Sequence, residues 1–117
     1  MMNVVKLELT LALLGGAALA ALAVLSATAD SKPGVTVQLF QFRPSPLAVP
    51  AGAPVTWLNQ DDITHTITSG TPEKRDGRFN LQLAGKGATG TVEFTDAGVY
   101  PYFCDRHQSM RGEIRVN

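Results

Sequence analysis

Three side chains that can bind a metal stand close together near the end of the chain. The segment Cys104-Asp105-Arg106-His107-Gln108-Ser109-Met110 carries a thiol, an imidazole and a thioether. It follows Val99–Phe103, an aromatic stretch that is typical of a strand. Because a tight loop after a strand can turn all three side chains toward one point, the spacing indicates a metal site.

His65 is the only other histidine, and it lies upstream in the β-branched stretch Ile63–Thr68. From a second strand it could reach the same point as Cys104, His107 and Met110. The resulting set is one thiolate, two imidazoles and one thioether. Soft sulfur ligands favour copper, and two His and one Cys in a plane with a weak axial Met form a blue-copper electron-transfer site. Zinc would more often take another Cys, His or carboxylate than a Met.

Each of these residues also has a purely structural interpretation. Cys104 alone could be a small buried apolar residue, and Met110 could fill the core. His65 could be a hydrogen-bonded core histidine. The joint pattern favours ligands, because the only cysteine and the only two histidines would otherwise have no reason to share this arrangement. An exported free thiol would also be open to oxidation.

Composition excludes several classes of protein. The chain has 117 residues, a length that fits one small domain. It has ten basic and ten acidic residues and no net charge, so it lacks the surplus of basic residues that binding to nucleic acid requires. One cysteine allows neither an internal disulfide nor a four-cysteine zinc site. Two histidines are too few for a second catalytic metal. We therefore do not expect an enzyme such as a copper nitrite reductase or oxidase.

The N-terminal run Leu9–Ala29 contains no charged residue. As a helix it would span about 30 Å, enough to cross a bilayer core. Ala27-Thr28-Ala29 favours a cleaved signal peptide, whereas the length of the run favours an uncleaved membrane anchor. Both interpretations divide the chain into a signal or anchor helix, residues 1–29, and one domain, residues 30–117. Both place that domain in the periplasm or elsewhere outside the cytoplasmic membrane.

The domain reads as short strands separated by turn residues. Charged residues in Glu73–Asp76, with Arg78, indicate a solvated loop. No helical periodicity follows Asp30, so the pattern indicates an all-β antiparallel sandwich or barrel. The expected strands lie within residues 35–42, 47–49, 55–57, 63–68, 89–95, 99–103 and 113–116.

The ordered motifs of the domain resemble those of the cupredoxins, in particular the small plastocyanin-like and amicyanin-like copper proteins. The resemblance implies an eight-stranded Greek-key β-sandwich with His65, Cys104, His107 and Met110 as ligands of one type 1 copper ion. The short spacing from His107 to Met110 is similar to that of amicyanins. The motifs are Phe40-x-Phe42-x-Pro44, Leu47-x-Val49-x-x-Gly52-x-x-Val55-x-Trp57-x-Asn59-x-Asp61, His65-Thr66 and Gly98-x-Tyr100-x-Tyr102-x-Cys104-x-x-His107-x-x-Met110-x-Gly112.

The resemblance also suggests roles for residues around the ligands. Asp96-x-Gly98-x-Tyr100 resembles a tyrosine corner, in which the hydroxyl bonds to the backbone. Asn59 and the backbone N–H of Thr66 would fix the loops and the Cys104 sulfur beside the metal. Members of the family often have Pro next to the C-terminal His ligand. Here Arg106 and Gln108 flank His107, which predicts a more polar docking surface.

The expected function is transfer of one electron between redox protein partners, such as a cytochrome, an oxidoreductase or an oxidase. The protein would act as a monomer, and electrons would pass through the imidazole of His107. A periplasmic copper carrier or storage protein is the alternative. Carriers typically expose clusters of Met and His, whereas here a Cys completes the set.

Overall fold

The computed structural model describes residues 32–117, which contain strands, turns and loops. Within these residues no helix is long and apolar enough to span a membrane. The expected signal or anchor helix, and the boundary at residue 29, lie outside the described residues.

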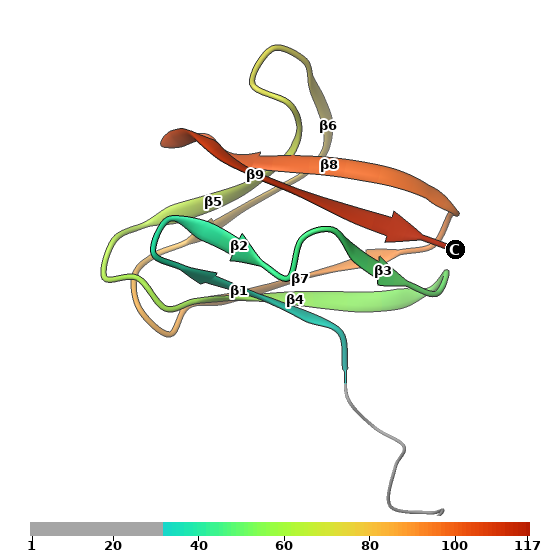
Figure 1. Ribbon diagram of the computed structural model, residues 1–117, viewed down its shortest axis with the longest axis horizontal. Helices are drawn as coiled ribbons and strands as arrows, with labels where there is room; N and C mark the ends of the chain where they lie inside the picture. The colour runs from blue at the N-terminus through green and yellow to red at the C-terminus, as the bar shows by residue number, and fades with distance from the viewer. Residues whose placement is uncertain (1–31) are drawn as a thin grey trace, which may run out of the picture. The chain divides into compact units, whose positions relative to one another are not determined.

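The described domain consists of two β-sheets packed face to face (Figure 1). The first sheet has the order β2-β1-β4-β7, and the second has the order β3-β9-β8-β5-β6. This is the all-β, two-sheet arrangement that the strand pattern indicates. The strands are β1 (Gly34–Gln38), β2 (Gln41–Arg43), β3 (Leu47–Val49), β4 (Ala53–Asn59), β5 (His65–Gly70), β6 (Arg75–Leu83), β7 (Thr89–Phe94), β8 (Gly98–Cys104) and β9 (His107–Val116).

The described residues form nine strands, so the expected number of eight is wrong. The stretch expected as one strand, Val35–Phe42, is two strands joined by a turn at Leu39 and Phe40. The strand Arg75–Leu83 was not expected, because its first half carries charged residues and glycine. It forms because it lies at the edge of the second sheet, where its side chains remain largely exposed while its backbone pairs with β5.

Two neighbouring pairs are parallel, β1 with β4 and β3 with β9. The expected antiparallel pairing is wrong at these two places. The chain leaves the first sheet after β2, adds β3 to the edge of the second sheet, and returns with β4. After this excursion β4 runs beside β1 in the same direction. Parallel neighbours need a crossover connection of this kind.

Tyr100 donates a hydrogen bond to the Asp96 carbonyl at 2.7 Å, which confirms the expected tyrosine corner.

The core lies between the two sheets and includes two of the expected ligands. Cys104 and Met110 belong to the same buried cluster, so the candidate site lies at one end of the core. The other buried members are Val35, Val37, Phe42, Val49, Val55, Trp57, Ile67, Leu83, Phe94, Tyr102, Ile114 and Val116.

Tyr102 is a buried phenol without a hydrogen-bond partner. Its ring meets Trp57 edge-on at 5.4 Å, and the indole Nε1 of Trp57 also has no partner. The ring lies against Gly112, where a Cβ atom would overlap the Tyr102 ring. Burial raises the pKa of Tyr102 to about 12, and the nearby indole offsets this only in part.

We expect Tyr102 to make the folded protein sensitive to alkaline pH. Between pH ~10 and ~12 the unfolded chain loses this phenol proton while the folded chain retains it, so the free energy of unfolding falls by about 2 kcal/mol. Tyr102→Phe should remove that loss, measured by denaturant unfolding of the metal-free protein.

Tyr100→Phe is the matched control. It should cost about 1 kcal/mol at neutral pH, because it loses the hydrogen bond to Asp96, and it should keep the alkaline loss. If Tyr102→Phe and the wild type lose stability equally above pH ~10, the assignment to Tyr102 is wrong.

Candidate metal centre

Three strands of the second sheet position three of the four expected ligands. His65 begins β5, Cys104 ends β8 and His107 begins β9. Because β8 lies between β5 and β9 and is antiparallel to both, the starts of β5 and β9 lie beside the end of β8. His65 and Cys104 are fully buried, and His107 is partly exposed.

The expected loop from Cys104 to Met110 is a hairpin with a bulge. Cys104 pairs directly with His107, whereas the preceding Phe103 pairs with Arg111. The residues between His107 and Arg111 are therefore extra on β9. Such a bulge redirects side chains, and here Met110 is buried in the core while Gln108 and Ser109 are exposed.

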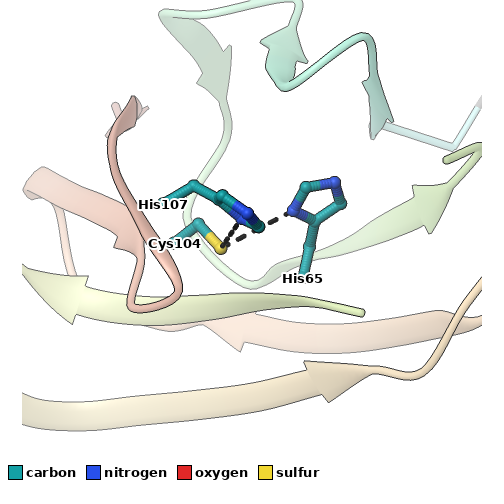
Figure 2. A group of neighbouring side chains, drawn as sticks. All are labelled: His65, Cys104 and His107. Atoms are coloured by element: carbon teal, nitrogen blue, oxygen red, sulfur yellow. Dashed lines mark hydrogen bonds between the residues drawn. The ribbon is translucent and has the colours of Figure 1, made fainter. Parts of the chain in front are cut away.

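The thiol and both imidazoles meet at one point (Figure 2). The Cys104 Sγ lies 3.6 Å from His65 Nδ1 and 3.8 Å from His107 Nδ1, and the three ligand atoms lie within 4.8 Å of one another. With metal–nitrogen and metal–sulfur bonds of about 2.05 and 2.3 Å and an angle of about 120°, a trigonal site needs sulfur–nitrogen separations of about 3.8 Å. The side chains therefore fit a metal ion bound by one sulfur and two nitrogens.

The Cys104 sulfur also receives a backbone contact. The N–H of Thr66 lies 3.4 Å from Sγ, which is the contact that the resemblance suggested. The Thr66 hydroxyl accepts a hydrogen bond from the Asp105 N–H at 2.7 Å. One residue of β5 thus holds both the sulfur and the turn that follows it.

Sequence reasoning missed two residues at the centre, Asp61 and Phe40. The Asp61 Oδ2 lies 2.8 Å from His65 Nε2, the ring nitrogen that faces away from Cys104. Burial by itself raises the pKa of Asp61, but hydrogen bonds from Phe40, Leu39 and His65 hold that pKa below its ordinary value. The Asp61 position stands in the motif, yet nothing in the sequence shows where its carboxylate points.

The Phe40 ring packs edge-on against both imidazoles. Its centroid lies 5.4 Å from that of His65 and 4.9 Å from that of His107. Phe40 lies in the turn between β1 and β2, in the other sheet. No local sequence signal links it to residues of β5 and β9.

Asn59 fixes the loop that leads to His65. Its side-chain amide donates hydrogen bonds to the carbonyls of Ile63, at 2.8 Å, and Leu83, at 3.1 Å. Its Oδ1 accepts a hydrogen bond from the N–H of Asp61 at 2.9 Å. The fully buried Asn59 therefore supports the loop beside the centre, as expected.

Comparison with known proteins gives consistent matches. The sequence model of copper binding proteins of the plastocyanin/azurin family matches residues 29–117. The chain is 34% identical over 83 residues to a plastocyanin from Scenedesmus fuscus, covering 64% of this chain and 85% of the plastocyanin. It is 27% identical over 88 residues to amicyanin from Paracoccus denitrificans, covering 75% of this chain and 67% of that protein. The solved structure of a purple cupredoxin from Nitrosopumilus maritimus superposes with a TM-score of 0.67 at 26% identity, covering 74% of this chain and 100% of that one.

The Thr66 hydroxyl gives a direct test of how the turn after Cys104 is held. Thr66→Val keeps the shape but removes the acceptor for the Asp105 N–H. We expect it to cost about 1 kcal/mol of unfolding free energy in the metal-free protein and to speed amide exchange at Asp105. Thr66→Ser keeps the oxygen and should behave like the wild type. Equal amide exchange at Asp105 in both variants would contradict this role.

Proposed function

The chain belongs to the plastocyanin/azurin family of copper-binding proteins, and we propose that it carries single electrons between redox proteins outside the cytoplasmic membrane. The family assignment confirms the cupredoxin resemblance of the motifs, and members of the plastocyanin and amicyanin type are electron carriers. His65, Cys104, His107 and Met110 are the proposed ligands of one type 1 copper ion. Copper bound there would supply a one-electron redox couple, because its two oxidation states differ by one electron.

The observation that carries the proposal is the convergence of one buried sulfur and two imidazole nitrogens at sulfur–nitrogen separations that fit one metal ion. The three side chains come from the ends of adjacent strands of one sheet. A rigid sheet holds its ligands in nearly the same place in both oxidation states, so little has to move when an electron is transferred. The Thr66 N–H and the burial of Cys104 tune the potential.

Electrons would enter and leave through His107, the one member of the trio that is partly exposed. Arg106 and Gln108 beside it are exposed and polar. Apolar surface comes instead from the loops that lead to the centre, where Leu39, Phe40 and Ile63 are 73%, 50% and 41% exposed. A small face of this kind suits the weak, short-lived docking of redox partners to a monomer.

A catalytic role is less well supported. A surface hollow lies around the turn before β8, whereas Cys104 ends that strand. The hollow is therefore separated from the centre by the length of β8. With two histidines in the whole chain, a second metal with several His ligands has no donors.

A copper carrier or storage protein is the second candidate. Such proteins release their metal readily, and exposed Met and His clusters serve that purpose. Here His65, Cys104 and Met110 are all buried, so three of the four proposed ligands have no direct access to solvent. Burial favours a permanently bound ion that changes oxidation state over one that is handed on.

The location of the domain follows from the segment before it. The uncharged run Leu9–Ala29, ending in Ala27-Thr28-Ala29, supports export with either cleavage or retention as an anchor. We therefore propose a periplasmic or other extracytoplasmic location. Cytochromes, oxidoreductases or oxidases on that side of the membrane are the proposed partners.

Visible absorption and redox cycling test the proposed function. The copper-loaded protein should be intensely blue, from charge transfer between the Cys104 thiolate and copper, and should bleach and recover over repeated reduction and oxidation without losing metal to a chelator. Cys104→Ser should lose the band entirely, since the chain has no other cysteine. Gln108→Ala, an exposed neighbour of His107, should keep it.

The outcomes separate the two candidate functions. A band that survives in Cys104→Ser, or a loaded wild type with no intense visible band, contradicts the proposed site. The purple cupredoxin among the similar structures makes intensity and cysteine dependence better criteria than hue. Rapid loss of copper to the chelator on reduction would favour the carrier.

Met110 is proposed as a weak axial ligand. Met110→Leu conserves the volume of this buried side chain, so unfolding free energy should change by less than about 1.5 kcal/mol. The loaded variant should stay coloured and should have a higher reduction potential by voltammetry, because a sulfur donor to the oxidised ion is lost. Ile114→Val changes the core on the same strand and should leave the potential unchanged. Loss of copper binding in Met110→Leu would contradict a purely tuning role.

A further inference from the structure

The turn between β1 and β2 is strained. Gln38 pairs with Gln41, which leaves Leu39 and Phe40 as the two central residues. Their φ angles are 53° and 59°, as a type I′ hairpin turn requires, and this turn strongly prefers Asn-Gly or Gly-Gly. Bulky side chains persist in the left-handed region only where surrounding contacts enforce it. The turn therefore needs a specific support.

The Asp61 carboxylate supplies that support. Its Oδ1 accepts a hydrogen bond from the Leu39 N–H at 2.8 Å, and its Oδ2 accepts one from the Phe40 N–H at 3.1 Å. Both donors belong to the strained turn. The backbone N–H of Asp61 donates a hydrogen bond to Oδ1 of the buried Asn59 at 2.9 Å, so the carboxylate extends from an anchored backbone.

The same carboxylate faces His65. The Asp61 Oδ2 lies 2.8 Å from His65 Nε2, and an ionised carboxylate can only accept. Nε2 is therefore the nitrogen that carries a proton and donates it to the carboxylate. Nδ1, the nitrogen left for a metal ion, faces the Cys104 sulfur at 3.6 Å.

The side chain of Phe40 brings the turn into contact with the second imidazole, that of His107. Half of this side chain is exposed, so burial alone does not explain its position. Its ring lies edge-on against His65 and His107, whose own centroids are 5.3 Å apart. The backbone of Phe40 is held by Asp61 and its ring contacts both imidazoles.

We infer that Asp61 is a positioning residue that sets the geometry of both imidazoles before a metal binds. It orients His65 directly, by fixing the proton on Nε2, and restrains His107 indirectly, by holding the turn that carries Phe40. The inference rests on the proposed function, because the positions of the two imidazoles matter for activity only if they bind copper. The arrangement itself is a property of the metal-free protein, and it can be tested there.

The first test is NMR of the histidine rings in metal-free protein. In the wild type we expect a protected Nε2–H proton on His65 and slow amide exchange at Leu39 and Phe40. Asp61→Ala should expose that ring proton to exchange, populate a second tautomer and speed exchange at both amides. Asp62→Asn removes a carboxylate from the neighbouring, exposed position and should match the wild type. A wild-type His65 ring that carries its proton on Nδ1 and none on Nε2 overturns the inference.

The second test is copper affinity, by competition titration with Cu(II). Loss of a carboxylate that orients a ligand histidine typically lowers metal affinity about 10- to 100-fold, and we expect this for Asp61→Ala but not for Asp62→Asn. An unchanged affinity in Asp61→Ala overturns the inference. A wild type that binds no copper overturns the proposed function instead, and the ring-proton result still decides the role of Asp61.

Two further variants keep the test decisive if Asp61→Ala folds poorly. Asp61→Asn keeps one acceptor oxygen for three donors, so at least one of the two turn amides or the ring proton must lose protection. Leu39→Gly in the Asp61→Ala background relieves the strain and should restore the contact between the Phe40 and His107 rings, followed by NOE, without restoring the protected His65 ring proton. If Leu39→Gly restores both, Asp61 acts only on the turn and the direct part of the inference is wrong.

Discussion

The hydrogen-bonded ladder through β5, β8 and β9 is the constraint on which the centre depends. β5 pairs with β8 through Thr68 and Phe103, and β8 pairs with β9 through Cys104 and His107. Each pairing fixes where a ligand strand begins or ends relative to the others. A slip of one residue would turn Cys104 to the opposite face of the sheet. The close approach of the sulfur and the two nitrogens is therefore a consequence of strand register.

The ladder places the backbone of His65 and His107, but a second set of contacts orients their rings. Asn59 holds the loop before β5, and the carboxylate of Asp61 joins that loop to the ring of His65 and to the β1–β2 turn. These contacts connect the two sheets at one end of the sandwich. A domain of this size buries a limited apolar area, so polar contacts at the open end matter for holding the ligands still.

The same turn changes the surface through which electrons would pass. The sequence predicts a polar face around His107, because Arg106 and Gln108 flank it. Both residues are exposed as expected, yet Leu39 and Phe40 add apolar surface from the opposite sheet. The proposed docking face thus combines polar residues close to His107 in sequence with apolar residues that only folding brings there.

The chemistry proposed for the centre and the class of fold could be predicted from the sequence. A lone cysteine, two histidines and a methionine in a family-like order give the proposed donors, and alternating short strands separated by turn residues indicate an all-β sandwich. These signals are local, because residue type and short-range periodicity carry them.

The remaining features of the fold and of the centre depend on contacts between distant segments. The edge strand β6 forms despite its charged sequence, because β5 provides backbone hydrogen-bond partners. The parallel pairs follow from the crossing of the chain between the two sheets. The bulge that buries Met110 follows from the register of β8 and β9. The roles of Asp61 and Phe40 could not be predicted from the sequence, because a carboxylate or a phenyl ring has no local signature that tells which distant imidazole it will meet.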